Sequence, residues 1–355
     1  MNYDVAIIGA GPSGATLARI LGEKMPERRI LIVDAQTDKN PKVCGGLLSE
    51  CAQKLFARFD MVLPSEILVS PQIFAVDVID LATGRERRYQ KHYLNMDRAA
   101  FDRWLISLLP GNVDIVNGRC REISKDGEKF KLTVTNDSIT EIYRCDIAVG
   151  ADGAASFVRK KITKRAVRKY TSIQEWYRCE DKKQLPRYSC IYDKKTSESC
   201  SWTIRKGEYF IYGGAFKTNK CRDAFEKQKA RLTDYLGCEF GEPIRTEACL
   251  VCSPKSRRDF VHGKDGIFLI GEAAGFISAN SYEGISNAML SAKLLADALK
   301  KADLNKSAAL RYYKRASIPL LNKMKRRIAK NRVLSSHFCR NAILASGISS
   351  IKKFD

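Results

Sequence analysis

Three glycine-containing segments have the residue types that bind phosphate groups and sugar hydroxyls. They are DVAIIGAGPSG (residues 4–14), GADGAASFVR (residues 150–159) and GEAAGF (residues 271–276). Glycine lets a backbone come close to a phosphate, and the N-terminus of a following helix stabilises the phosphate charge. The segments lie far apart in the chain, so a common site requires that the fold bring them together.

The first segment has the spacing of a dinucleotide-binding turn. An apolar strand (residues 5–8) precedes the glycines and a helix (residues 15–21) follows them. A second apolar strand ends at Asp34, twenty residues after Gly14, where an acidic side chain can bind a ribose hydroxyl. The residues expected at the nucleotide are Gly9, Gly11, Pro12, Ser13, Gly14, Asp34 and Ala35.

The other two segments distinguish a flavin-binding protein from a general nucleotide-binding protein. The third, with Gly271, Glu272 and Gly275, would bring a loop or helix N-terminus close to the flavin ring. A positive dipole at that point stabilises the negative charge of reduced flavin. Gly284 and Ile285 open a further helix whose N–H groups can do the same. The three segments together predict non-covalently bound FAD.

The order of the elements predicts an α/β fold with interleaved domains. Residues 1–65, 94–165 and 255–304 are assigned to a Rossmann-like FAD-binding domain, and residues 66–93 and 166–254 to a mostly antiparallel β substrate domain. Residues 305–355 form a basic helical C-terminal region. Its apolar positions either pack on the protein's own body or lie on a lipid surface; they are Leu320, Leu321, Met324 and Ile328.

The composition is that of a globular protein with a basic surface. The 355 residues are 45% hydrophobic and 29% charged, and no apolar run approaches the roughly 20 residues that span a bilayer. Asp4 and the glycine turn occupy the place of a signal peptide's apolar region. The formal charge of +22 favours an anionic membrane, an anionic substrate or an acidic electron carrier over nucleic acid, for which no motif is present. A basic surface that is simply solvated is the alternative interpretation.

Twelve cysteines are scattered through the chain without the spacing of metal ligands, although Cys249 and Cys252 are three residues apart. This pattern favours reduced thiols and no metal site. We therefore predict a cytoplasmic protein, and contact with the inner face of the membrane is left open.

The motifs and their order resemble the geranylgeranyl reductase family and, within it, a bacterial CbrA-like branch. The resemblance covers roughly residues 1–300. Its further marks are KVCGG (residues 42–46), DRAAFD (residues 97–102), SWTIRKG (residues 201–207) and SYEGI (residues 281–285). It implies a glutathione-reductase-type FAD fold and an FAD-dependent oxidoreductase.

The resemblance also implies roles for individual residues. Arg98 would lie near the FAD phosphates, with pairing to Asp102 as its alternative role. Asp152 and Gly153 would support the FAD-binding loops, while Ser156 and Arg159 either bind FAD or cap the following helix. Glu272 stands where relatives generally carry Asp, and it would bond the ribityl chain with a shifted backbone.

The residues expected at the reactive face of the flavin are Cys44, Gly45, Gly46 and Trp202. Cys44 is either a catalytic thiol or a packing cysteine. Trp202 lies in a segment that resembles a family motif lining an isoprenoid pocket, but Ile204 and Arg205 replace an aromatic residue and a proline. Trp202 is therefore either a pocket wall or a core aromatic, and the strand with Gln174 is a second candidate wall.

The leading function is a reductase that transfers hydride from reduced flavin to a C=C bond of an isoprenoid-like, lipid-like or other apolar small molecule. The alternatives are a flavin-dependent monooxygenase and a non-catalytic FAD-bound protein at the membrane. NAD(P)H and a ferredoxin or flavodoxin are both open as the reductant, because no second glycine fingerprint is present.

Overall fold

The computed structural model of the chain describes residues 1–35, 42–136, 139–179 and 186–352. It is a mixed α/β fold with two large sheets, which confirms the predicted fold class at that level. Two compact units are present: unit 1 is Met1–Lys42, Arg98–Arg168 and Cys252–Arg326, and unit 2 is Val43–Asp97, Lys169–Val251 and Arg327–Asp355. Residues 353–355 of the predicted C-terminal region lie outside the described residues.

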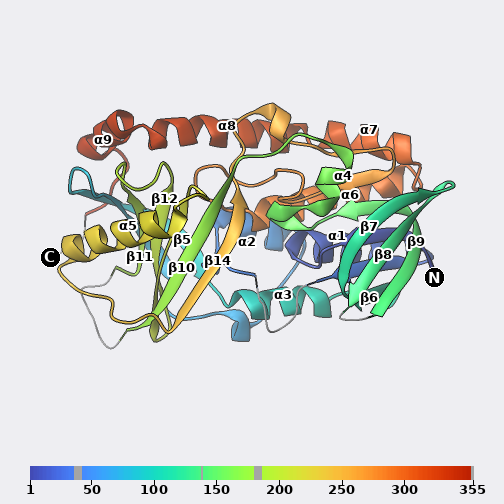
Figure 1. Cartoon of the computed structure of the whole chain (residues 1–355), viewed down its shortest axis with the longest axis horizontal. Coiled ribbons are helices and arrows are strands. Elements are labelled where there is room, and N and C mark those ends of the chain that lie inside the picture. The colour runs from blue at the N-terminus through green and yellow to red at the C-terminus, as the bar shows by residue number, and fades with distance from the viewer. Residues whose placement is uncertain (36–41, 137–138, 180–185, 353–355) are drawn as a thin grey trace. The chain divides into compact units, whose positions relative to one another are not determined.

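The sheet of unit 1 has a parallel core in the order β16-β9-β1-β2-β6 (Figure 1). An antiparallel hairpin, β7 and β8, joins it through β9, and β15 pairs with β16. The strands are β1 (Asn2–Ile8), β2 (Ile30–Asp34), β6 (Val113–Asn117), β7 (Arg119–Asp126), β8 (Lys129–Asn136), β9 (Ile139–Gly150), β15 (Gly263–Lys264) and β16 (Ile267–Leu269).

Helices cover the parallel strands, which explains why β1 and β2 are almost continuous apolar runs. α1 packs against α6, and both bury most of their residues. The helices of this unit are α1 (Pro12–Lys24), α3 (Arg98–Ser107), α4 (Phe157–Ile162), α6 (Ile285–Lys301) and α7 (Lys306–Ala316).

Unit 2 is built on a mostly antiparallel sheet in the order β14-β10-β13-β12-β11-β4-β5-β3, in which β11 and β4 are parallel. The strands are β3 (Leu47–Leu48), β4 (Ile73–Asp80), β5 (Arg85–Asn95), β10 (Lys169–Arg178), β11 (Tyr188–Tyr192), β12 (Cys200–Lys206), β13 (Tyr209–Phe216) and β14 (Arg245–Cys252). The helices of this unit are α2 (Glu50–Arg58), α5 (Cys221–Leu236) and α9 (His337–Ser346).

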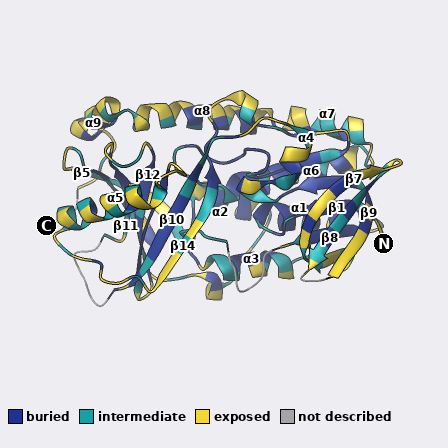
Figure 2. Ribbon diagram, viewed as in Figure 1, coloured by how far each residue is buried: buried dark blue, intermediate teal, exposed yellow. Residues whose placement is uncertain are grey.

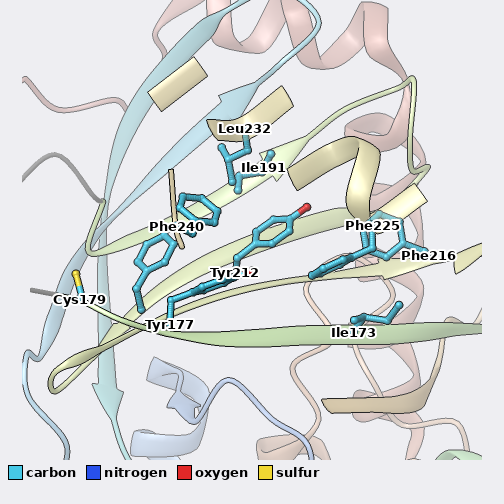
Figure 3. Packing of buried hydrophobic residues seen from close by; sticks show 10 residues of the cluster. Ile173, Tyr177, Cys179, Ile191, Tyr212, Phe216, Phe225, Leu232 and Phe240 are labelled. Carbon is cyan, nitrogen blue, oxygen red and sulfur yellow. The ribbon is translucent and has the colours of Figure 1, made fainter. Parts of the chain in front are cut away.

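One face of this sheet packs against α5 and forms the core of the unit. Figure 3 shows the strand residues Ile173, Tyr177 and Tyr212 meeting Phe225 and Leu232 of α5. Because successive strand residues point to opposite faces, Gln174, Trp202 and Gly213 belong to the other face. Trp202 is therefore not part of this aromatic core.

The C-terminal region is helical as predicted, and α8 (Ile318–Ser335) crosses the boundary between the units at Arg326. Its apolar positions Leu320, Leu321, Met324 and Ile328 are all buried (Figure 2). The structure therefore corrects the lipid-surface option for these four residues, because packing within the protein already removes them from solvent.

The units differ from the domains predicted from the sequence at residues 43–65 and in the C-terminal region, and by a few residues at 94–97, 166–168 and 252–254. Residues 43–65 belong to unit 2, because β3 pairs with β5. Residues from Arg327 onward also belong to unit 2, where Ile351 bridges to Arg88 of β5.

Candidate functional site

The three glycine-containing segments of unit 1 follow strands that end at the same edge of the parallel sheet. Ile8 pairs with Gly150 and with Val33, and Leu269 pairs with Gly150. The chain then leaves β1 at Gly9, β9 at Ala151 and β16 at Ile270. Ligands of open α/β sheets bind outside the carboxyl ends of the strands. The fold therefore brings the three predicted segments to one site.

The three glycines of the first segment have different surroundings. Gly9 has φ +106°, and a Cβ there would lie 2.6 Å from the carbonyl oxygen of Ala151. A Cβ on Gly14 would collide with the carbonyl oxygen of Gly9, so this glycine allows α1 to pack closely on the turn. A Cβ on Gly11 would meet no atom of the described chain within 4 Å.

Gly11 is thus the one glycine of the three that the described protein itself does not require. Its φ of −62° is accessible to any L-residue, and it is the N-cap of α1. No side chain of the described residues caps this helix end. Open space in front of an uncapped helix N-terminus is the arrangement that accepts a phosphate.

Asp34 ends β2 beside this turn. Its Oδ1 accepts a hydrogen bond from the backbone N–H of Ala10 at 3.2 Å. The carboxylate is half-buried, and Ala35 after it is exposed. The predicted ribose-binding acid is therefore held next to the glycine turn, as that role requires.

The second segment is organised by Asp152. Its Oδ2 accepts from the N–H of Phe157 at 2.7 Å and of Val158 at 3.1 Å, and its Oδ1 accepts from the Ser156 hydroxyl at 2.5 Å. The Ser156 hydroxyl in turn accepts from the N–H of Arg159 at 2.9 Å. Asp152 and Ser156 therefore cap α4, which is the helix-capping alternative given for Ser156.

Arg159 connects the second segment to the third. Its Nη1 donates to the carbonyl of Ala273 at 3.0 Å and its Nη2 donates to the carbonyl of Asp259 at 2.8 Å. The side chain is buried. Arg159 is therefore a positioning residue for the turn 271–276, a role that sequence reasoning missed.

The turn 271–276 packs directly on the first segment. A Cβ on Gly271, which has φ +56°, would lie 2.8 Å from Oγ of Ser13. Glu272 Oε1 accepts from the N–H of Cys252 at 2.8 Å. Gly275 has φ +92° and lies against the backbone of Asp259. The structure thus gives Glu272 a partner in the chain, while its predicted bond to the ribityl chain stays a prediction.

Two further predicted residues begin helices of unit 1. Gly284 is the N-cap of α6 and Ile285 its first residue, and no described side chain caps this end. Arg98 begins α3, and its Nε lies 3.0 Å from both carboxylate oxygens of Asp102. This pair is the alternative role given for Arg98, and contact with a phosphate stays a prediction.

In unit 2, the segment Cys44–Gly45–Gly46 lies over β12. A Cβ on Gly45 would lie 2.5 Å from Cδ1 of Ile204 and 4.0 Å from Nε1 of Trp202. The N–H of Gly46 donates to Sγ of Cys44 at 3.4 Å. Cys44 is half-exposed rather than a core cysteine.

Lys206 is a buried lysine that contacts this segment. Nζ of Lys206 donates to the carbonyl of Met96 at 2.6 Å and to Oδ1 of Asn95 at 2.8 Å, and lies 3.5 Å from the carbonyl of Gly46. Burial lowers the pKa of Lys206 to about 8. Sequence reasoning missed this residue, although a lysine in a buried strand was a visible signal.

Trp202 and Gln174 leave polar atoms without partners on the sheet face opposite α5. Among the described residues, neither Nε1 of Trp202 nor Oε1 of Gln174 has a hydrogen-bond partner, and both atoms are buried. Glu247 accepts from Nε2 of Gln174 at 2.6 Å, which identifies the other amide atom as the oxygen. Buried polar groups are rarely left unpaired, so this face has the character of a ligand site.

Three further features of the described chain concern metal ligands, disulfides and membrane-spanning helices. Within the described ranges, no three His, Cys, Asp or Glu side chains gather as metal ligands would. All twelve cysteines are in those ranges and none forms a disulfide. No helix in the described part of the chain has the length and apolar character to cross a bilayer.

Comparison with known proteins gives a clear set of relatives, although no protein-family model matches the chain. Protein CbrA of Escherichia coli (strain HS) is 39% identical over 356 residues, covering 99% of this chain and 95% of the relative. Protein CbrA of Shigella sonnei is also 39% identical, covering 99% and 98%.

Solved structures similar to this chain include a reductase-like protein, a monooxygenase and a flavin-dependent brominase. A geranylgeranyl bacteriochlorophyll reductase-like protein from Thermoplasma acidophilum has a TM-score of 0.81 at 18% identity, covering 96% of this chain and 89% of the other. The p-nitrophenol 4-monooxygenase PnpA of Pseudomonas putida has a TM-score of 0.67 at 14% identity, covering 99% and 100%. A flavin-dependent brominase has a TM-score of 0.69 at 17% identity, covering 98% and 93%. The chain therefore has the fold of these enzymes.

Proposed function

This chain belongs to the CbrA family, and we propose that it is an FAD-dependent oxidoreductase that reduces a C=C bond of an isoprenoid-like or other apolar substrate. The observation that carries the flavin assignment is the open space at Gly11, at the uncapped N-terminus of α1. The other glycines of the turn are explained by packing and φ, whereas a phosphate group bound in front of the helix would explain Gly11.

The residues present fit FAD, and unit 1 would be its domain, of the glutathione-reductase type. Backbone N–H groups after Gly11 would bind the pyrophosphate, and Asp34 would bind a ribose hydroxyl. The turn 271–276 would border the rest of the cofactor, held in place by Arg159. When bound, FAD supplies the hydride chemistry, and the protein supplies binding and orientation.

Two observations support the reductase assignment within this class. The TM-score of 0.81 with the reductase-like protein exceeds the 0.67 with PnpA. In unit 2, Trp202 and Ile204 offer an apolar wall beside the segment Cys44–Gly46. A C=C reduction also needs a proton at the second carbon, and the half-exposed Cys44 thiol is our candidate donor. A cytoplasmic location is part of this proposal.

The flavin assignment is tested by Gly11→Val. A side chain there enters open space, so the variant should fold like the wild type but lose at least nine-tenths of its bound FAD. The measurement is the FAD-to-protein ratio after purification, with circular dichroism as the check on folding.

Gly111→Val is the matched control, because Gly111 is exposed in unit 1 and its Cβ would also meet no described atom within 4 Å. This variant should retain FAD. A Gly11→Val protein that purifies with a full complement of FAD would remove the first segment from the cofactor site.

The reaction class is tested by the product formed from an isoprenoid lipid. A reductase adds two hydrogen atoms under anaerobic conditions with dithionite-reduced protein, and the reduced protein reacts slowly with air. A monooxygenase, the alternative suggested by the fold of PnpA, adds one oxygen atom and requires air. Bound FAD without turnover under either condition would indicate a non-catalytic flavoprotein.

A further inference from the structure

In α9, the last helix of the described chain, a charged side chain is buried and apolar side chains are exposed. The charged side chain of α9, Arg340, is buried, together with Leu344 one turn later. The outward face has no charged residue among its exposed positions, which are Phe338, Cys339, Ala342, Ile343, Ala345 and Ser346 (Figure 2). A surface helix of a globular protein normally shows the opposite pattern.

The reversal is fixed by a buried ion pair in unit 2. Nε of Arg340 donates to Oδ2 of Asp80 at 2.8 Å, and its Nη1 donates to the carbonyl of Leu334 at 2.6 Å. The guanidinium also lies over the ring of Tyr192, 4.8 Å from its centroid. Rotating α9 to bury its apolar face would break these contacts, so Phe338 and Ile343 stay outward.

The exposed apolar surface continues beyond the helix. Phe338 is 82% exposed and Ile348 is 71% exposed, and Ile351 is also exposed. We call the outward residues Phe338, Ala342, Ile343, Ala345, Ile348 and Ile351 the C-terminal apolar surface. Large apolar residues exposed close together in the chain, here on one helix face and in the segment after it, are typical of a site of interaction.

The charge around this surface indicates the chemistry of its partner. In unit 2, residues 327–354 contain six Lys and Arg and no Asp or Glu. Lys330, Arg332 and Lys352 are exposed in unit 2. Apolar side chains beside a purely basic segment match the boundary between acyl chains and anionic headgroups. Nucleic acid would match the charge but not the exposed Phe338 and Ile348.

We propose that the C-terminal apolar surface docks on an anionic lipid bilayer, with Phe338 and Ile348 entering the acyl boundary and Lys330 and Arg332 contacting the headgroups. This inference is independent of the proposed flavin chemistry. The lipid-facing residues of this proposal are those of the C-terminal apolar surface. They are not the buried residues of α8 that the sequence analysis had offered for that role.

The test is co-sedimentation of the full chain with vesicles. Wild type should bind vesicles that contain phosphatidylglycerol and should bind pure phosphatidylcholine at least tenfold more weakly. Phe338→Ser/Ile348→Ser should weaken binding to the anionic vesicles at least tenfold, and Lys330→Glu/Arg332→Glu should remove the preference for anionic lipid.

Ile244→Ser is the matched control. Ile244 is 53% exposed in unit 2 and directly precedes β14, whereas α9 and Ile351 are attached to β4 and β5 near the opposite end of the strand order. The six strand spacings between β14 and β5 amount to roughly 29 Å. This variant should bind the anionic vesicles like the wild type.

Four results would overturn the proposal. One is a wild type that does not sediment with anionic vesicles, and another is equal loss of binding in Ile244→Ser. The third is a concentration-dependent dimer, seen by analytical ultracentrifugation, that Phe338→Ser/Ile348→Ser abolishes while vesicle binding persists. That result would assign the surface to a second copy of the chain. Tighter binding to duplex DNA than to vesicles would assign the basic segment to nucleic acid.

Discussion

At the scale of a single residue, the burial of Lys206 predicts that the free energy of unfolding depends on pH. Burial lowers the pKa of Lys206 to about 8, from 10.5. Between these values the unfolded chain binds a proton that the folded chain has released, so the free energy of unfolding rises with pH. The full effect across this window is about 3 kcal/mol at most.

The measurement compares wild type with Lys206→Met by urea unfolding from pH 7 to pH 10.5. The stability of the wild type relative to the variant should increase with pH above 8 and stay constant below it. Lys330→Met, at an exposed lysine, should show no such trend. A constant difference between wild type and Lys206→Met over the whole range would show that the pKa of Lys206 is not lowered in the folded protein.

Residues differ in how far the sequence could predict their role. The spacing of Gly9, Gly11, Gly14 and Asp34 predicted a site because their roles depend on local backbone geometry. Arg159 binds a carbonyl 114 positions away, and such a contact has no local signal. Arg98 is intermediate, because its pairing with Asp102 one turn later follows from helix geometry alone.

At the scale of elements, the stability effects of substitutions at Gly14 and Gly11 distinguish a glycine required for packing from one required for ligand binding. A Cβ on Gly14 would collide with the Gly9 carbonyl, whereas one on Gly11 meets no described atom within 4 Å. Gly14→Ala should therefore lower the free energy of unfolding by about 1–3 kcal/mol, the usual cost of overpacking. Gly11→Ala should lower it by no more than about 1 kcal/mol, the difference between glycine and alanine at a helix N-cap.

Chemical unfolding of the FAD-free proteins measures both variants without the contribution of bound ligand. Gly111→Ala serves as the control for a glycine in open space. If Gly11→Ala destabilised the apoprotein as much as Gly14→Ala, then Gly11 would be required by the fold, and the argument for a phosphate site would fail.

The sequence could predict where some strands and helices lie in the chain, but not which side of each is buried. Periodicity identified β1, β2, β12 and the C-terminal helices. It did not show which side of α8 is covered, because an amphipathic pattern fits both a protein core and a lipid surface. For Trp202, the pairing of β12 with β13 places the side chain opposite the aromatic core. That placement needs the register, which the sequence does not contain.

At the scale of the whole molecule, docking on lipid and flavin chemistry make a joint prediction. If the substrate is a lipid-borne isoprenoid, the docked enzyme meets it at the bilayer, whereas a small electron acceptor such as ferricyanide reaches the flavin from solution. Phe338→Ser/Ile348→Ser should therefore lower turnover of an isoprenoid in phosphatidylglycerol vesicles by on the order of 10-fold. Reduction of ferricyanide by the same variant, first reduced with dithionite and freed of the excess, should equal that of the wild type treated in the same way.

The two assays distinguish failure of one proposal from failure of the other. Equal loss in both would mean that the substitutions damage the fold or the flavin site. Equal activity of variant and wild type on the vesicles would mean that the substrate reaches the protein from solution, because partition of the enzyme onto the bilayer would then not limit turnover. Ile244→Ser, exposed on the same unit but at the opposite end of the sheet from the C-terminal apolar surface, should match the wild type in both assays.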